Sequence, residues 1–237
     1  MSFPKFVSFL KDGLFIPTCK EFEDKWEGLL PIKTIKSKEG KEGYLEKFNI
    51  LAQWIYISCW HKEDCENYSM WKIYGQISEA VAIETTMSKL ELAYLKDFDD
   101  SLAYLDEVTY VQIENTDMIN MPRNIRHIGN PPSQVKGGQS FPHLLFCFLK
   151  DKGYESEKEV RLVALDKAFT HNISNPKKGI YINFKGIDSF IQKIRLSPTA
   201  PRWFNDVVSD LIKKYGIDAD IEHSRFFKQP PTFLPLS

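Results

Sequence analysis

Two glutamates and an arginine alternate near the end of the segment Tyr154–Arg161, which reads YESEKEVR. Alternate side chains of a strand point to the same face, so Glu157, Glu159 and Arg161 are expected to project together. Two neighbouring carboxylates repel each other unless a cation or a proton lies between them, and Arg161 can supply that charge. Glu159 and Glu157 are therefore candidate catalytic residues, and Arg161 is a candidate ligand-binding residue. The alternative is an ion-pair ladder on an edge strand that only keeps the edge soluble.

A second candidate is the aromatic segment Ser69–Tyr74, which reads SMWKIY. Trp71 and Tyr74 are three residues apart, so they are neighbours on one face if the segment is helical. Flat rings of this kind can stack on a nucleotide base or a nicotinamide, which makes both residues candidate ligand-binding residues. The alternative is that the two rings only pack in the core, because Trp and Tyr contribute large buried areas.

Thiol and imidazole side chains near position 60 raise the question of a metal site. Cys59, His61 and Cys65 could supply three ligands, but no second pair occurs at zinc-finger spacing, so we expect no metal site. His61 is retained as a candidate ligand-binding residue. The four cysteines have no regular spacing and the chain starts without a secretory signal, which favours reduced core thiols in a cytoplasmic protein.

The stretch 118–150 contains no Asp or Glu, although 32 of the 237 residues are acidic. Its basic side chains are Arg123, Arg126, His127, Lys136, His143 and Lys150. A glycine-rich basic loop can wrap around an anion, so Arg123 and Arg126 are candidate ligand-binding residues for a pyrophosphate. The alternative is a solvated loop that happens to lack acids. The net charge of −1 argues against nucleic acid as a partner.

The elements that must position these residues follow from composition and periodicity. With 43% hydrophobic residues, the 237 residues can form one domain, 1–237, with its own core. Strands and helices mix without regular βαβ alternation, so the expected fold class is α+β, a mixed and mostly antiparallel sheet with flanking helices. The longest apolar stretches are too short to cross a membrane.

Individual elements are placed by hydrophobic period and by Gly and Pro. We expect helices over 3–11, 44–54, 66–74 (capped by Asp64), 87–95, 142–150 and 201–216, and strands over 14–17, 55–59, 80–84, 108–114, 157–165, 179–184, 193–196 and 217–221. Prolines and glycines predict a long flexible loop at about 115–140, and a C-terminal tail covers 226–237.

The order of the motifs resembles a large bacterial family catalogued as a domain of unknown function. That family couples an MWxxY helix to a later (W/Y)xxExExR strand, which are Met70–Tyr74 and Tyr154–Arg161 here; the resemblance covers roughly Phe6 to Ser224. Near its start the family often has Asn-Asp-Pro-Phe-Glu, where this chain has only Glu21-Phe-Glu-Asp24. The family is distantly similar to abortive-infection proteins, so the resemblance implies a role in phage defence.

Two functional hypotheses follow, and whether the chain is an enzyme is left open. In the first, the chain handles a nucleotide or NAD by an ADP-ribosyltransferase-like reaction. A glutamate stabilises the cationic transition state, a ring stacks on the leaving base and an arginine holds the pyrophosphate; the residues are Glu159, Glu157, Trp71, Tyr74, Arg123, Arg126 and Arg161. In the second, the chain is a non-catalytic sensor or binding module for a nucleotide or a phage-derived ligand. The first hypothesis requires the strand near position 159 and the helix near position 71 to share one cavity.

Overall fold

The computed structural model describes residues 1–22, 50–63, 65–75, 78–98, 102–115, 125–129, 142–166 and 176–227. The chain forms two compact units, each assembled from separate segments. Unit 1 comprises Met1–Leu14, Glu63–Leu90 and Asn183–Ser237, and unit 2 comprises Phe15–Lys62 and Glu91–Ile182. The helices and the mixed sheets confirm the predicted α+β class. The expectation of one domain over 1–237 stays a prediction.

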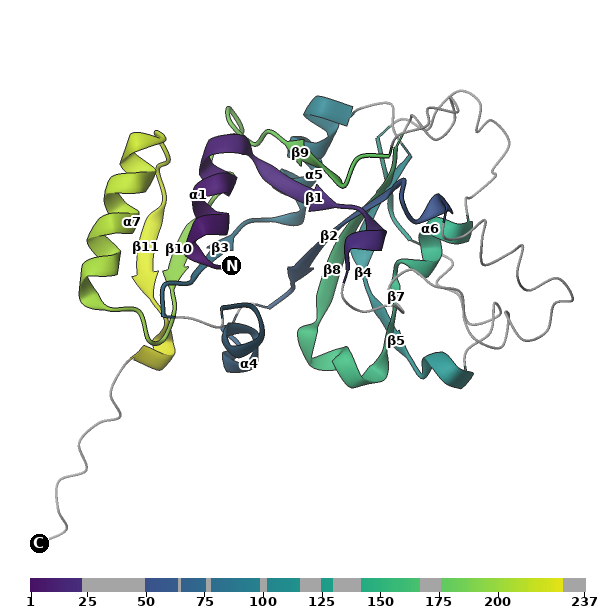
Figure 1. Ribbon diagram of the computed structural model, residues 1–237, viewed down its shortest axis with the longest axis horizontal. Coiled ribbons are helices and arrows are strands. Elements are labelled where there is room, and N and C mark those ends of the chain that lie inside the picture. Colours follow the sequence, from purple (N-terminus) through teal and green to yellow (C-terminus); the bar gives the residue numbers. More distant parts are fainter. Residues whose placement is uncertain are drawn as a thin grey trace, which may run out of the picture. The chain divides into compact units, whose positions relative to one another are not determined.

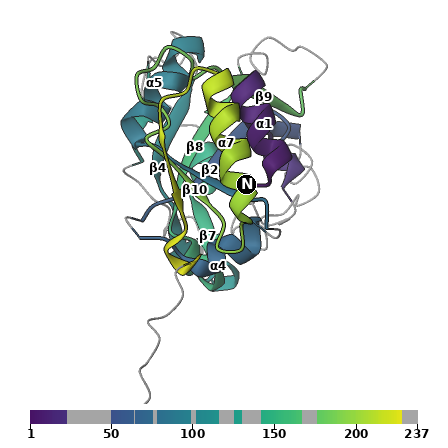
Figure 2. The same cartoon turned by 90° about the vertical axis from the view of Figure 1, so that its left-hand side faces the viewer.

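Unit 1 is built on a three-stranded sheet with two helices packed against it (Figures 1 and 2). Its central strand β10 (Lys193–Leu196) pairs in parallel with β11 (Asp220–His223) and antiparallel with β3 (Val81–Glu84). Helices α1 (Phe3–Asp12) and α7 (Arg202–Lys214) lie side by side in Figure 2. Their contact includes the rings of Phe3 and Phe204, whose centroids are 5.2 Å apart.

The sequence pattern accounts well for α7. Phe204, Val208 and Ile212 recur every four residues and are buried, as expected for the apolar stripe of an amphipathic helix. Gly216 follows the helix with a φ of +67°, a left-handed conformation that favours glycine, so the predicted helix end is confirmed. α1 buries Phe6, Phe9 and Leu10 in the same way.

The aromatic segment of unit 1 folds differently from the prediction. It consists of a short helix α4 (Tyr68–Met70) followed by the π-helix η2 (Trp71–Gly75). The cap is Asn67, whose side chain accepts a hydrogen bond from the Ser69 amide at 2.9 Å. The predicted start at 66 is therefore wrong, because the Asn67 side chain satisfies the first turn two residues later. The predicted Asp64 cap lies outside the described residues.

Unit 2 is built on a four-stranded antiparallel sheet in the order β2-β8-β4-β6. The strands are β2 (Ile55–His61), β8 (Glu159–Leu165), β4 (Ala103–Glu107) and β6 (His127–Ile128). β8 pairs on both sides and all seven of its residues are buried. The alternative that its charged residues decorate an edge strand is therefore wrong.

The strand register separates the two faces of this sheet. Arg161 lies opposite Cys59 on β2, whereas Tyr56 lies opposite Ala164 on β8. Because side chains alternate, Arg161 and Tyr56 project from opposite faces. The face of Arg161 continues into a hydrophobic core. That core also takes in residues from the end of helix α6 (Pro142–Phe146) and after it; its members include Trp54, Ile55, Ile57, Tyr104, Leu144, Cys147, Phe148, Val163 and Leu165.

Short pairs of strands complete unit 2. β5 (Thr109–Val111) runs parallel to β7 (Leu149–Asp151), and β1 (Leu14–Pro17) pairs with β9 (Gly179–Ile182). Glycine is required at 179, because a Cβ there would lie 2.4 Å from the Phe15 ring and 2.6 Å from the Ile16 carbonyl oxygen.

The remaining elements among the described residues are helix α5 (Met87–Phe98), which begins in unit 1 and ends in unit 2, and four 3₁₀ turns. The turns are η1 (Cys19–Glu21), η3 (Ile113–Asn115), η6 (Lys152–Glu157) and η8 (Arg225–Phe227). The predicted helix 142–150 is wrong beyond 146, because Leu149–Asp151 pairs with β5 instead. Most of the expected loop at 115–140 lies outside the described residues, as does most of the tail at 226–237. None of the described helices has the length and apolarity to cross a membrane.

Candidate functional site

Four charged side chains are buried together in unit 2; we call Lys150, Glu157, Glu159 and Arg161 the charge cluster. The Lys150 ammonium donates to Glu157 Oε2 at 3.0 Å and to Glu159 Oε1 at 2.9 Å. Arg161 Nε donates to Glu159 Oε2 at 2.6 Å, and Arg161 Nη1 donates to the Cys147 carbonyl at 2.6 Å. Two cations and two carboxylates balance in formal charge, which is the condition under which buried charges are tolerated.

The cluster depends on a turn that the sequence pattern did not indicate. Glu157 ends the 3₁₀ turn η6 and is not on β8, so the predicted shared strand face holds only for Glu159 and Arg161. The Asp151 side chain accepts from the Gly153 amide at 2.9 Å and starts this turn. Lys158 then adopts a left-handed φ of 42°, which returns the chain into β8. The turn brings Glu157 beside Lys150 on β7.

The electrostatics of the cluster favour a permanently charged Glu159. Burial by itself raises the pKa of this carboxyl, but the charge of Arg161 and the charge and hydrogen bond of Lys150 outweigh burial and lower the pKa to about 2. At neutral pH Glu159 is therefore an acceptor that already binds two cations. Such a carboxylate holds the fold together well but takes up a proton poorly.

His61 lies beside the cluster. It is directly opposite Glu159 in the β2–β8 register, and its Nδ1 is 2.5 Å from the Glu157 carbonyl oxygen. A carbonyl only accepts, so Nδ1 carries the hydrogen. Nε2 is buried and has no hydrogen-bond partner among the described residues. The structure thus brings together His61, Glu157, Glu159 and Arg161, four of the predicted site residues.

Of the two loop arginines expected to hold a pyrophosphate, the described one, Arg126, is not part of this group. Arg126 donates from Nη2 to Glu91 Oε2 at 2.7 Å and from Nε to the Leu105 carbonyl at 3.5 Å. The Arg126 carbonyl accepts a hydrogen bond from the Leu105 amide on β4, so Arg126 lies on the side of β4 away from β8. Arg123 lies outside the described residues. In the acid-free stretch, the two described Lys and Arg side chains, Arg126 and Lys150, are therefore neutralised by acids from elsewhere in the chain.

The aromatic residues predicted to stack on a base belong to unit 1. Trp71 is partly buried, and its Nε1 donates to Glu66 Oε1 at 3.0 Å. Glu66 also accepts from the Arg225 amide at 2.7 Å, so the indole is tied to a local polar network. Tyr74 is 50% exposed. Because Trp71 and Glu159 lie in different units, their predicted convergence on one cavity stays a prediction.

All four cysteines are free thiols, but only two are in the core. Cys19 and Cys147 are buried, whereas Cys59 and Cys65 are exposed. The prediction of four core thiols is wrong for the exposed pair, because Cys59 lies on edge strand β2 and Cys65 lies outside any strand or helix. In the described part of the chain, no three His, Cys, Asp or Glu side chains are placed to hold a metal ion.

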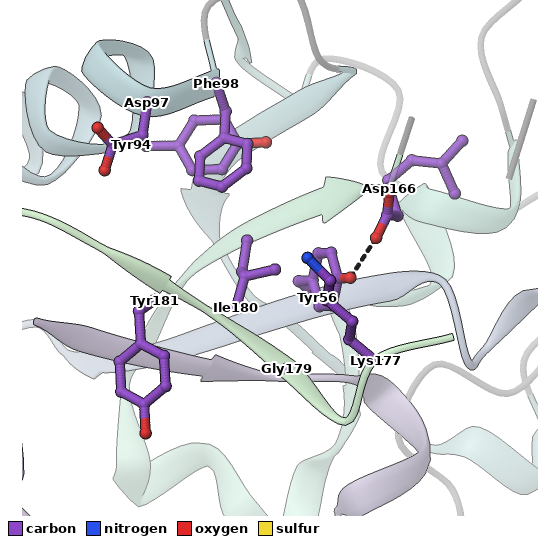
Figure 3. A pocket seen from close by; sticks show the side chains of 10 residues that line it. Tyr56, Tyr94, Asp97, Phe98, Asp166, Lys177, Gly179, Ile180 and Tyr181 are labelled. Carbon is purple, nitrogen blue, oxygen red and sulfur yellow. Dashed lines mark hydrogen bonds between the residues drawn. The ribbon is translucent and has the colours of Figure 1, made fainter. Parts of the chain in front are cut away.

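Sequence reasoning missed a cavity on the opposite face of the same sheet (Figure 3). We call it the aromatic pocket; its volume is about 420 Å³, and it is lined by Tyr56, Tyr94, Asp97, Phe98, Leu165, Asp166, Lys177, Gly179, Ile180 and Tyr181. Pockets for small ligands typically measure roughly 300–1,000 Å³. All ten residues belong to unit 2.

The pocket has an aromatic side and a polar side. The rings of Tyr94 and Phe98 on α5 are stacked with centroids 5.3 Å apart, and Figure 3 shows them across the pocket from Tyr56. The Tyr56 hydroxyl donates to the Asp166 carboxylate. Burial and this carboxylate raise the pKa of Tyr56, so the phenol stays a neutral donor. In the same view, the Tyr181 ring points away from Tyr94.

The sequence contained partial signals for this pocket. Tyr56 is a polar-tipped ring inside the apolar strand Ile55–His61, and Asp166 directly follows the all-buried strand β8. Tyr94 and Phe98 are four residues apart on a helix, hence on one face. However, Tyr56 and Asp166 are 110 residues apart in the chain, and only the strand register brings them together.

Neither the known protein-family models nor the curated proteins nor the solved structures contain a match to this chain. The resemblance to a domain-of-unknown-function family, and the similarity to abortive-infection proteins that it implies, therefore stay predictions. The geometry of the charge cluster and of the aromatic pocket is the basis for assigning a function.

Proposed function

We propose that this protein is a non-catalytic binding module for a small nucleotide-class ligand, and that the ligand binds in the aromatic pocket of unit 2. The observation that carries the proposal is the contrast between the two groups of side chains. The pocket is a cavity with rings, carboxylates and an ammonium along its walls. The charge cluster, in comparison, has its carboxylates bound by its own cations.

The apolar walls suit a planar ring. Phe98 and Ile180 present hydrocarbon surface, and the ring of Tyr94, stacked on Phe98, extends it. Aromatic side chains stack on nucleobases irrespective of base type, at about 1–3 kcal/mol per base. A ring bound here would replace water along these walls.

The polar groups suit the remainder of a nucleotide. A carboxylate can accept several hydrogen bonds, so Asp166 can bind both the Tyr56 hydroxyl and a donor of the ligand, such as a ribose hydroxyl or an exocyclic amine. Lys177 supplies an ammonium that can pair with a phosphate. Rings, carboxylate and ammonium together match base, sugar and phosphate.

The ADP-ribosyltransferase hypothesis has less support from the same geometry. It assigns Glu159 or Glu157 to the reacting sugar, yet both are about 5% exposed and bound to Lys150. A substrate would have to break these ion pairs before reaching either carboxylate. A sensor that reports a nucleotide needs no such rearrangement, and it is also compatible with the implied role in phage defence.

The direct test is calorimetric titration of the purified chain with adenosine, guanosine, cytidine, uridine, their 5′-monophosphates and NAD. We expect saturable binding of at least one of them. Phe98→Leu, which keeps an apolar side chain but removes the ring face, should weaken that binding by about tenfold. The matched control is Tyr74→Leu in unit 1. If only Tyr74→Leu weakened binding, the ligand site would lie in unit 1 instead. If none of the compounds bound, the proposal would be wrong.

A second measurement separates binding from catalysis. The chain is incubated with NAD and free nicotinamide is quantified over time, with Glu159→Gln in parallel. We expect no release above the buffer rate from either protein. Release by the wild type that is lost in Glu159→Gln, with unchanged melting temperature, would favour the transferase instead.

A further inference from the structure

We infer that unit 1 has a surface that binds single-stranded nucleic acid, in addition to the proposed ligand pocket of unit 2. The surface consists of Tyr68 and Lys72 from the aromatic segment and of Arg225 and Phe226 from η8, and we call it the ring-and-cation patch. It shares no residue with the aromatic pocket, so this inference and the proposed function can be tested independently.

The two rings of the patch are exposed and contact each other. Tyr68 is 45% exposed and Phe226 is 39% exposed, and their ring centroids are 5.3 Å apart in an edge-to-face arrangement. A single exposed ring on a protein surface is common and needs no explanation. Two exposed rings in contact offer a stacking surface for the bases of a single strand, because every base has a face that can stack.

Each ring is accompanied by a cation. The Lys72 ammonium lies over Tyr68, 5.4 Å from the ring centroid, and the guanidinium carbon of Arg225 lies 4.8 Å from the centroid of Phe226. Within the described part of the chain, neither cation forms an ion pair with a carboxylate. Both charges can therefore pair with the phosphates of a ligand.

Glu66 holds the two halves of the patch together. Its carboxylate accepts from the Arg225 amide at 2.7 Å and from the Trp71 indole at 3.0 Å, and its backbone carbonyl accepts from Arg225 Nη2 at 2.8 Å. Only 6% of the Glu66 side chain is exposed, so this acid adds little negative surface to the patch. A surface that is fixed before the ligand arrives binds it at a smaller cost in conformational entropy.

The repetition of one ring with one cation favours a single-stranded nucleic acid over other anionic partners. Each nucleotide offers one base to a ring and one phosphate to a cation. An acidic peptide brings charge without a flat group for each charge. A membrane surface requires apolar side chains that reach into the acyl region, whereas Tyr68 and Phe226 are more than half buried. The net charge of −1 gives no long-range attraction, so we expect weak and salt-sensitive binding.

The test is a fluorescence-anisotropy titration of labelled oligouridine and oligothymidine of about ten nucleotides with the full chain, at about 50 mM salt. We expect saturable binding of at least one of them, and weaker binding of a duplex of equal length, because paired bases are not available for stacking. Tyr68→Leu and Phe226→Leu should each weaken binding by about tenfold. The matched control is Trp203→Leu, which removes an exposed ring on α7 of unit 1.

The salt dependence tests the cations separately from the rings. Lys72→Gln should reduce the slope of log affinity against log salt concentration by about one, as expected for the loss of one phosphate contact. Lys213→Gln, at an exposed lysine on α7, is the control and should keep the slope of the wild type. Thermal melting followed by circular dichroism checks that each variant keeps its fold.

Several outcomes would overturn the inference. They are the absence of oligonucleotide binding, binding that does not depend on salt, and binding that neither ring variant weakens. Binding that is lost in Phe98→Leu would assign the oligonucleotide to the aromatic pocket instead. Binding of phosphatidylserine vesicles through Tyr68 and Phe226, with no binding of oligonucleotides, would make the patch a membrane-binding surface. The proposed function has its own test, which is the titration of Phe98→Leu with nucleosides and mononucleotides.

Discussion

Both faces of the four-stranded sheet in unit 2 carry polar side chains, which are ion-paired with one another on one face and line a pocket on the other. On one face, the charge cluster places two carboxylates between two cations, all at most 6% exposed. On the other face, the aromatic pocket places Asp166 beside a neutral phenol and next to open volume. Both regions combine two acids with a lysine, yet one is filled by its own side chains and the other encloses open volume.

The comparison shows that burial and charge alone do not identify a ligand site. Glu159 has a strongly perturbed pKa, which is a common mark of functional residues, but its perturbation comes from ion pairs within the protein. In the pocket, the lining leaves a volume that those same residues do not fill. We therefore expect changes in the cluster to affect stability first and changes in the pocket to affect binding first.

The largest effect is expected from Lys150→Met. It leaves Glu157 and Glu159 buried with Arg161 as the remaining cation of the cluster, and breaking a buried ion pair typically costs about 3–5 kcal/mol. Urea denaturation should show this loss in the free energy of unfolding. Lys152→Met, an exposed lysine two residues away, is the control and should change stability little. A loss below about 1 kcal/mol would show that Lys150 is not essential to the cluster.

The pH dependence of stability should identify the contribution of Glu159. Its pKa in the folded chain is about 2, below the ordinary value of 4.5, so the unfolded chain binds more protons between these values. The free energy of unfolding should therefore fall as the pH is lowered from about 4.5 to about 2, and this contribution is fully present above that range.

Glu159→Gln should be less stable than the wild type at pH 7 but should lose less stability on acidification. Urea denaturation at intervals from pH 7 to pH 2 measures both curves. Glu107 forms an exposed ion pair with Lys62, so Glu107→Gln serves as the control. Its free energy of unfolding should fall with decreasing pH as steeply as that of the wild type. Parallel curves for the wild type and Glu159→Gln would contradict the assigned pKa.

A smaller effect is expected at the edge of the pocket. Gly179→Ala places a Cβ against the Phe15 ring and the Ile16 carbonyl, so β1 and β9 must separate slightly. Overpacking of this kind costs about 1–3 kcal/mol. Because Gly179 also lines the pocket, ligand affinity should decrease in the same variant. Gly153→Ala is the control, since the added Cβ there meets only the Asp151 side chain at 3.2 Å. Unchanged ligand affinity in Gly179→Ala would show that the spacing of β1 and β9 does not affect the pocket.

The smallest effect is expected from Arg126→Gln. Its ion pair with Glu91 is partly exposed, with 48% and 25% of the two side chains accessible, and such pairs contribute about 0–1 kcal/mol. Nucleotide affinity should not change, because Arg126 does not line the pocket. Urea denaturation and calorimetric titration of this variant therefore measure the smallest changes in stability and affinity expected in the series. A marked loss of affinity would revive Arg126 as a phosphate-binding residue.

Local patterns were sufficient to predict the elements that carry a clear period. α7, β1 and β10 were placed correctly, since an apolar stripe and bounding Gly or Pro residues define them. β4 and β7 were missed, because they depend on pairing with distant strands, β8 and β5. Local sequence carries little information about such long-range pairings.

The candidate site was predictable to a similar degree. The association of Glu159 with Arg161 followed from strand alternation, but Lys150 was assigned to an anion-binding loop because its carboxylate partners lie beyond a 3₁₀ turn. The pocket could not be predicted from any single segment. Its walls come from β2, α5, the end of β8 and β9, and only the folded register brings them together.

The alternation of the chain between the two units has a consequence for its synthesis. Unit 2 is complete once residue 182 has left the ribosome, whereas unit 1 needs residues from 183 onward. Among the described strands, β3 has β10 as its sheet partner, and β10 is made more than a hundred residues later. The nascent chain thus carries β3 without that neighbour while unit 2 can already fold, and during this interval β3 is exposed to pairing with other chains.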